Sequence, residues 1–306
     1  MDIILSDMQS KVQYKLKSNS RLTIIRGNSG TGKSFFVKCL DLYKSFAKIS
    51  IKSNKELRHI NLDTILDLGV LREDIIYVMD EFDGINDQRI SKYINNPKYT
   101  FIIITRDTKL PHLIYDIDDI YRIRESDKFN ILEKEYNIYQ INSNKECSKI
   151  NSIQTEDSGS GLQFYRKLSA YDVRTSDGNS NINKNIKDNQ FNIVDSIAFG
   201  PYIKEYLTKT RKLNDILLAP KSFEYLLLTS GIFKNTLEEF ELSEKDYFKK
   251  LVEISKSKNI EYSKNKLDEW FLEDKQFIKI IDKLEKDFQV RIQRDEEINS
   301  KIDWGI

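Results

Sequence analysis

The sequence predicts an α/β protein with two sheet-containing units, the first built on a mostly parallel sheet, and a helical C-terminal region. Three observations predict it. Apolar, β-branched runs alternate with helical stretches in the first half. A glycine-rich loop joins one such run to a helix. The alternation starts again after a polar, aperiodic stretch at 142–149. We therefore expect units at 1–142 and 150–235 and a helical region at 236–306.

Short apolar runs mark the elements of the first unit. Runs rich in Ile, Val and Phe suit strands that are buried on both faces, and the stretches between them suit helices. The expected strands are 22–25, 47–51, 74–81, 99–106, 120–124 and 138–141. The expected helices are 33–45, 62–68 and 88–93.

The second unit has the same alternation in shorter elements. The expected strands are 150–154, 171–174, 191–195 and 216–218, and the expected helices are 161–168, 201–207 and 222–228. Residues 176–181 are rich in Asn, Ser, Asp and Gly, which predicts an exposed loop. From 237 to about 294, apolar residues recur at helical spacing, so that region should be helical.

The composition indicates a soluble globular chain of 306 residues, 32% charged and 39% apolar. The 49 basic and 48 acidic residues leave a net charge of +1, so a nucleic-acid partner would need a local patch. Two cysteines, Cys39 and Cys147, are too few for a disulfide framework. No apolar run approaches the roughly 18 residues that span a bilayer. We expect a cytoplasmic protein with no membrane partner.

Residues 27–34 match the pattern G-x-x-x-x-G-K-[ST] at every fixed position, between an apolar strand and a helix. In such loops backbone N–H groups surround phosphate oxygens, and the helix N-terminus adds partial positive charge. Lys33 would contact the β- and γ-phosphates, and the Ser34 hydroxyl would bind Mg²⁺. The alternative is a chance glycine-rich turn. The expected phosphate-binding residues are Gly27, Asn28, Ser29, Gly30, Thr31, Gly32, Lys33 and Ser34.

Two carboxylates, Asp80 and Glu81, follow the apolar run at 75–79. A buried strand that ends in Asp-Glu, after a phosphate loop, is typical of hydrolytic nucleotide sites. Asp80 would bind Mg²⁺ beside Ser34, and Glu81 would orient or activate the attacking water. The alternative is an acidic strand end that faces solvent.

Thr105 and Arg106 end the next apolar run, and either could sense the γ-phosphate. An arginine beside a phosphoryl group in transfer stabilises its developing charge, so Arg106 is also a catalytic candidate. The alternative is that Arg106 pairs with a nearby aspartate such as Asp107. Arg122 and Arg124 are further candidates for an arginine that acts in trans.

These residues resemble the P-loop ATPases of the additional-strand class, particularly the AAA+ and STAND groups. The resemblance covers about residues 1–140 and implies ATP and Mg²⁺ as cofactors. Gly27, Gly32, Lys33, Ser34, Asp80 and Glu81 match the nucleotide motifs of those families. The region that follows is too short for a complete helical lid, which puts assembly into a ring in doubt.

The second unit resembles the TOPRIM-like domains of OLD-family nucleases and of ATPase-linked phage-defence effectors. In that pattern, one strand ends in Glu and a later strand ends in Asp-x-Asp, and the carboxylates hold Mg²⁺ for phosphodiester cleavage. Glu156 and Asp195 match, but Ile197 stands where the second Asp is expected. Glu224 is a candidate replacement. The alternative is that these carboxylates only cap strand ends.

The sequence thus predicts an ATP-binding protein that hydrolyses ATP and couples it to a TOPRIM-like effector or nucleic-acid module. Such a pairing resembles antiphage or mobile-element proteins, with a protein partner or a second copy of the chain. The first alternative is a nucleotide-gated interaction protein with no nuclease activity. A small-molecule kinase is a weaker alternative, because such kinases usually lack a water-activating residue at the position of Glu81.

Overall fold

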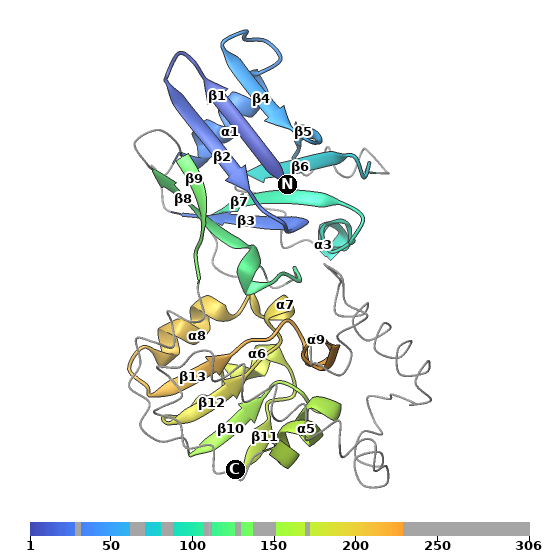
Figure 1. Ribbon diagram of the computed structural model, residues 1–306, viewed down its shortest axis with the longest axis vertical. Helices are drawn as coiled ribbons and strands as arrows, with labels where there is room; N and C mark the ends of the chain where they lie inside the picture. Colours follow the sequence, from blue (N-terminus) through green and yellow to red (C-terminus); the bar gives the residue numbers. More distant parts are fainter. Residues whose placement is uncertain are drawn as a thin grey trace. The chain divides into compact units, whose positions relative to one another are not determined.

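The computed structural model describes residues 1–27, 32–61, 71–80, 88–106, 110, 112–125, 130–136, 151–168 and 172–228. The chain divides into two compact units, Met1–Tyr136 and Asn137–Ile306 (Figure 1). Each unit contains its own β-sheet together with helices. Both units therefore have the mixed α/β character that the alternating pattern predicts.

The first unit contains a nine-stranded sheet with the order β4-β1-β2-β9-β8-β3-β7-β6-β5. Its strands are β1 (Asp2–Asp7), β2 (Val12–Lys17), β3 (Leu22–Arg26), β4 (Ile49–Ser53), β5 (Glu56–His59), β6 (Ile75–Asp80), β7 (Thr100–Thr105), β8 (Ile120–Glu125) and β9 (Asn130–Lys134). The part from β8 to β5 is parallel throughout. β1 is antiparallel to β2 and β4, and β9 is antiparallel to β8. The half of the sheet that contains β3 is therefore parallel, as predicted. The other half contains both parallel and antiparallel pairs.

The strands at the centre of the parallel half are apolar along their whole length because both of their faces are covered. All five residues of β3 are buried, and so are the apolar residues of β6 and β7. Helix α1 (Lys33–Leu42) follows β3, α3 (Gln88–Ile94) lies between β6 and β7, and the short 3₁₀-helix η2 (Ile117–Asp119) precedes β8. The strands predicted at 22–25, 74–81, 99–106 and 120–124 are confirmed to within two residues at each end.

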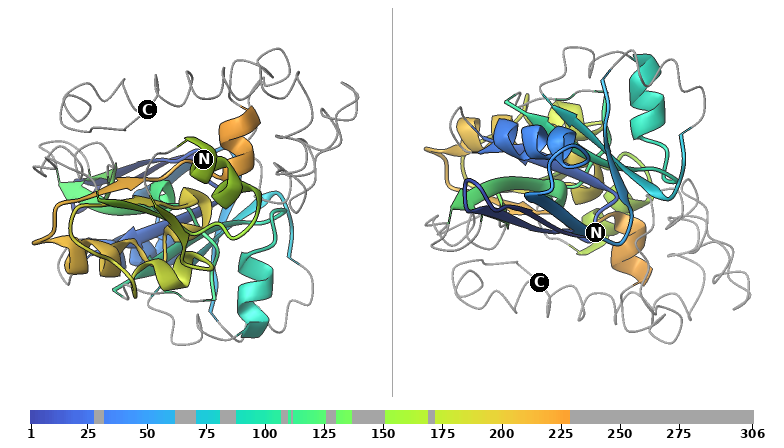
Figure 2. Two further views of the ribbon diagram at one scale, coloured as in Figure 1. Left: turned by 90° about the horizontal axis from the view of Figure 1, so that it is seen from below. Right: turned by 90° about the horizontal axis from the view of Figure 1, so that it is seen from above.

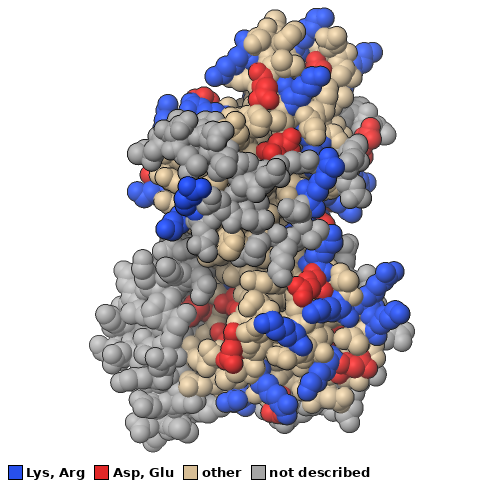
Figure 3. All heavy atoms as spheres, turned by 180° about the vertical axis from the view of Figure 1, so that it is seen from behind, with Lys and Arg blue, Asp and Glu red and all other residues tan. Residues whose placement is uncertain are grey.

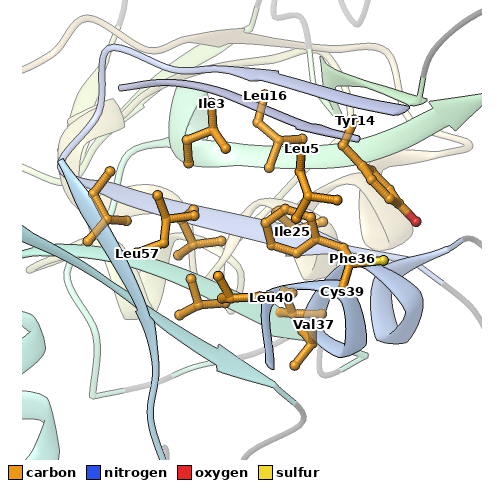
Figure 4. Packing of buried hydrophobic residues seen from close by; sticks show 14 residues of the cluster. Ile3, Leu5, Tyr14, Leu16, Ile25, Phe36, Val37, Cys39, Leu40 and Leu57 are labelled. Atoms are coloured by element: carbon orange, nitrogen blue, oxygen red, sulfur yellow. The ribbon is translucent and has the colours of Figure 1, made fainter. Parts of the chain in front are cut away.

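Helix α1 packs between the β1–β2 hairpin and the parallel strands. Leu5 and Leu16 of the hairpin point toward Phe36 and Leu40 of the helix, with Ile25 of β3 beneath them (Figure 4). All of these side chains are at most 5% exposed. Burial of each large apolar side chain contributes about 1.5–3 kcal/mol, so the hairpin is part of the main core of this unit.

The β1–β2 hairpin was not predicted from the sequence. Each of its strands mixes polar and apolar residues, with only one face buried. The turn between them is organised by Asp7, whose carboxylate accepts hydrogen bonds from the Gln9 N–H at 3.0 Å and the Ser10 hydroxyl at 2.6 Å. These bonds hold the pKa of Asp7 below its usual value. β5 and β9 are short, mostly polar strands that were likewise not predicted.

The second unit contains a four-stranded, fully parallel sheet with the order β11-β10-β12-β13. Its elements are β10 (Ser152–Thr155), α5 (Ser160–Leu168), β11 (Val173–Thr175), α6 (Asn179–Ile182), β12 (Gln190–Ile193), α7 (Ser196–Phe199), α8 (Ile203–Thr210), β13 (Asp215–Leu218) and α9 (Phe223–Leu228). Figure 2 shows α5 and α9 on one face of this sheet and α8 on the other. Phe164 of α5 and Phe223 of α9 pack together, with ring centroids 5.3 Å apart.

Several predicted boundaries are wrong in detail. The helix predicted at 33–45 ends at Leu42. The loop predicted at 176–181 contains the start of α6, and the strand predicted at 191–195 ends at Ile193, because Asp195 is already the N-cap of α7. The helix at 62–68, the strand at 138–141 and the C-terminal region at 236–306 lie outside the described residues. Within the described residues, every helix is too short or too polar to cross a membrane.

Candidate functional sites

The end of the glycine-rich loop is shaped by Gly32, the N-cap of α1. Its φ of 81° lies in the left-handed region, which favours glycine. The Gly32 carbonyl accepts two hydrogen bonds, from the Phe36 N–H at 3.0 Å and from the Tyr14 hydroxyl at 2.7 Å. The start of α1 is therefore anchored both by its own first turn and by a side chain of β2.

Lys33, the first residue of α1, connects the two described ends of the loop. Its side chain is buried, and its ammonium Nζ donates a hydrogen bond to the Gly27 carbonyl at 2.6 Å. Ser34, the next residue, is exposed. The predicted lysine thus lies across the base of the loop, and the predicted metal-binding hydroxyl is accessible at the helix N-terminus.

Asp80 and Thr105 lie at the same edge of the sheet as the loop. Thr105, the last residue of β7, is the register partner of Arg26, which directly precedes Gly27. Asp80, the last residue of β6, pairs with Ile104 of β7. The carboxyl ends of β3, β7 and β6 are therefore level. This is the edge where ligands bind in open α/β sheets.

The remaining predicted residues of this site are Arg106, Arg122 and Arg124, together with residues outside the described part of the chain. Arg106 is exposed, directly after β7. Both Arg122 and Arg124 form ion pairs with Glu133 across the β8–β9 ladder, at 2.8 Å and 3.3 Å. The hydrogen bond from Arg122 is the largest cause that lowers the pKa of Glu133. Asn28, Ser29, Gly30, Thr31, Glu81 and Asp107 lie outside the described residues.

Two residues beside the loop were missed by the sequence analysis. One is Tyr14. The other is Arg26, a buried arginine whose guanidinium donates to the hydroxyls of Tyr115 at 3.2 Å and Tyr136 at 3.4 Å. Burial raises the pKa of each of these tyrosines to about 12, although Arg26 opposes the shift. An arginine at a strand end has no local sequence pattern that predicts such partners, which lie far along the chain.

The predicted carboxylates of the second unit lie at the point where the strand order of its parallel sheet reverses. β10 connects through α5 to β11 on one side and is flanked by β12 on the other, so a topological switch point lies between β10 and β12. Glu156 directly follows β10, and Asp195 follows β12 after one residue. In open parallel sheets, ligands bind outside the strand ends at such a point.

Glu156 and Asp195 are in direct contact. The Asp195 N–H donates to the Glu156 Oε1 at 3.1 Å, and the Glu156 N–H donates to the Ile193 carbonyl at 3.1 Å. Asp195 is 8% exposed, and Glu224, in the first turn of α9, is 4% exposed. The sequence placed these residues 39 positions apart, and the parallel pairing of β10 with β12 brings them together.

Four carboxylates of this region contribute to the raised pKa of one buried hydroxyl, that of Tyr165 in α5. Burial is the largest cause that raises the pKa of Tyr165 well above its usual value, followed by the charges of Asp157, Asp195, Glu156 and Glu224. Gly161 leaves space for Asp157, because a Cβ there would lie 2.4 Å from the Asp157 carboxyl carbon. The switch point thus brings several carboxylates close to Tyr165.

Carboxylate oxygens are ligands that suit Mg²⁺ or Mn²⁺. Within the described residues, no three His, Cys, Asp or Glu side chains are arranged so that they could hold a metal ion as they stand. Ile197, at the position of the missing acid, lies in α7 and is half-buried. The structure therefore brings Glu156 and Asp195 together. The charge of Glu224 acts on the same Tyr165, but within the described residues these carboxylates do not form a set of metal ligands.

Comparison of the chain with protein-family models, with curated proteins and with solved structures finds no match in any of the three. The two candidate sites therefore rest on the residues, the register of their strands and the hydrogen bonds described above.

Proposed function

We propose that the first unit binds ATP with Mg²⁺ and hydrolyses it. The observation that carries this proposal is the hydrogen bond of the buried Lys33 to the Gly27 carbonyl, at the N-terminus of α1. A carbonyl is a neutral acceptor, whereas a triphosphate offers charged oxygens. Hydrogen bonds between ionised groups are roughly twice as strong as neutral ones, so a triphosphate would take the ammonium from Gly27.

The level strand ends support the remaining roles. Ser34 and Asp80 offer the hydroxyl and carboxylate oxygens that Mg²⁺ prefers. Thr105 is proposed to sense the γ-phosphate, Arg106 to stabilise developing charge, and Glu81 to orient the attacking water. The position of β7 between β3 and β6 supports the additional-strand resemblance.

The second unit is proposed to act as a TOPRIM-like effector or nucleic-acid module that the ATP cycle controls. The contact of Glu156 with Asp195 at the switch point, and the buried Glu224 nearby, support this assignment. Mg²⁺ bound there would supply charge neutralisation for phosphodiester cleavage. A role in antiphage defence or in a mobile element, in the cytoplasm and with a protein partner or a second copy, is the proposed context.

Calorimetry with Mg²⁺-ATP tests the first proposal. We expect Lys33→Ala to weaken binding by about 10–100-fold, because it removes charged hydrogen bonds to phosphate. Lys38→Ala is the matched control, since Lys38 is an exposed lysine of the same helix. Glu81→Gln should leave binding intact and lower turnover by about 100-fold or more. Equal binding by the Lys33 and Lys38 variants would remove the site assignment.

A nucleotide-gated interaction protein without nuclease activity is the second candidate function. Ile197 favours it, because a two-metal mechanism needs several carboxylates around ions about 3.5–4 Å apart. In this version the first unit still binds ATP, hydrolysing it slowly or not at all, and the second unit only holds partners.

A further inference from the structure

We propose that Tyr14 is a positioning residue for the phosphate loop, holding Gly32 so that the start of α1 faces the phosphates. This inference rests on the proposed nucleotide binding of the first unit. Tyr14 lies on β2, in the antiparallel half of the sheet, and 18 residues separate it from Gly32 in sequence. Its hydroxyl donates to the Gly32 carbonyl at 2.7 Å.

The fit between Tyr14 and Gly32 is close. A Cβ added to Gly32 would lie 2.9 Å from the Tyr14 hydroxyl oxygen, nearer than real Cβ atoms approach. The Gly32 carbonyl also accepts the Phe36 N–H, the first hydrogen bond of α1. Tyr14 therefore contacts the loop at the point where it becomes a helix, one residue before Lys33.

Tyr14 is itself held in place from three sides. Its side chain is 1% exposed, and its ring packs edge-on against Phe36, with centroids 5.4 Å apart. Asn130 of β9 is its register partner on the neighbouring strand. Burial raises the pKa of Tyr14 above its usual value, so the hydroxyl remains protonated and able to donate. The result is a rigid donor aimed at a backbone carbonyl.

Two hydrogen bonds thus hold the described ends of the loop, one from Tyr14 to Gly32 and one from Lys33 to Gly27. In the proposed binding step Lys33 leaves Gly27 for phosphate. The bond from Tyr14 is kept, because it joins two neutral groups and its acceptor is also the carbonyl that begins the hydrogen bonding of α1. Tyr14 therefore fixes the end of the loop that contains Gly32 while the lysine changes partner, which keeps the N–H groups of α1 pre-arranged for phosphate.

The test compares Tyr14→Phe with Tyr77→Phe. Tyr77 is also 1% exposed, and its hydroxyl accepts the Arg72 N–H at 2.8 Å, in the segment before β6. Each variant loses one buried hydrogen bond and keeps its ring. We expect Tyr14→Phe to raise the Kd for Mg²⁺-ATP by about tenfold and Tyr77→Phe to leave it unchanged. The binding of inorganic tripolyphosphate to Tyr14→Phe should weaken by the same factor, because the hydroxyl positions the phosphate-binding loop and does not contact the base.

The outcomes separate the two proposals. Binding of ATP by Tyr14→Phe as tightly as by the unmodified chain would overturn the positioning role, and so would an equal loss in Tyr77→Phe. If the unmodified chain bound neither ATP nor tripolyphosphate, the proposed function would fail as well. Thermal melting of both nucleotide-free variants, which should be similar, ensures that a loss of affinity is not a loss of fold.

Discussion

Gly32 lies at the centre of the contacts that support the proposed nucleotide site of the first unit. It adopts a left-handed backbone, caps α1 and receives the Tyr14 hydroxyl on its carbonyl. Any side chain here would meet two separate obstacles, the positive φ and the Tyr14 oxygen at 2.9 Å. Gly178 in the second unit has a φ of 107° but nothing within 4 Å of an added Cβ, so it meets only the first obstacle.

This contrast gives a prediction at the residue scale. Gly32→Ala should destabilise the first unit by about 2–3 kcal/mol, of which about 1–2 kcal/mol is backbone strain. Adding Tyr14→Phe removes the atom that an alanine Cβ would approach. A double-mutant cycle by urea unfolding should therefore show a favourable coupling of about 1 kcal/mol between the two changes.

The same cycle with Gly178→Ala is the control and should show additive effects, because a Cβ added at Gly178 has nothing within 4 Å. Additive effects for Gly32→Ala and Tyr14→Phe would instead contradict the close approach of the hydroxyl to Gly32.

The β1–β2 hairpin contacts the first turn of α1 and shares its core. It covers α1 with Leu5 and Leu16 and brings Tyr14 to the helix N-terminus (Figure 4). In an amphipathic strand only alternate residues face the core, and here those residues face a helix rather than solvent. The hairpin therefore both completes the core and supports the site.

Leu5→Ala tests this element. Leu5 is fully buried, so the change should lower the free energy of unfolding by about 2–5 kcal/mol through lost burial and a residual cavity. Ser6→Ala, at the neighbouring half-buried position, should change it by about 0.5 kcal/mol or less. Denaturant unfolding followed by circular dichroism measures both. A loss in Leu5→Ala no larger than in Ser6→Ala would place the hairpin outside the core.

At the scale of the whole molecule, the chain joins two sheets that each present acidic or polar residues at their strand ends. The second sheet concentrates negative charge around Tyr165, although the chain is nearly neutral overall. On the face in Figure 3, lysine and arginine side chains lie among acidic ones. If the second unit binds nucleic acid, divalent cations at these carboxylates would be needed to offset the repulsion between their charges and the phosphates.

A cleavage assay separates the two candidate functions at this scale. If the second unit is a nuclease, a plasmid incubated with Mn²⁺ or Mg²⁺ should be cut, and Glu156→Ala and Asp195→Ala should each lower the rate by about 100-fold or more. Asp172→Ala is the matched control, because Asp172 is an exposed carboxylate at the opposite end of β11. No cleavage by the unmodified chain, with and without ATP, would favour the interaction protein.

Elements with strong local patterns were predicted well from the sequence. The strand at 22–25, the start of α1 at Lys33 and the buried strands that end near Asp80 and Thr105 agree with the structure to within two residues. Short polar strands such as β5 and β9 were missed, because their half-buried patterns resemble those of loops. Asp195 was predicted as a strand end and is instead a helix N-cap. The ends of elements as short as β12 and α7 cannot be located from sequence patterns to within one or two residues.

The sequence by itself determined the strand, the glycine loop and the helix around Lys33, since these depend on apolar runs and on one glycine that are close along the chain. Only the tertiary structure decided which distant groups meet there. Strand pairing brought Tyr14 to Gly32 and Asp195 to Glu156, across 18 and 39 residues. Such pairings follow from which faces the folded sheet buries, and burial is a property of the whole unit rather than of any one segment.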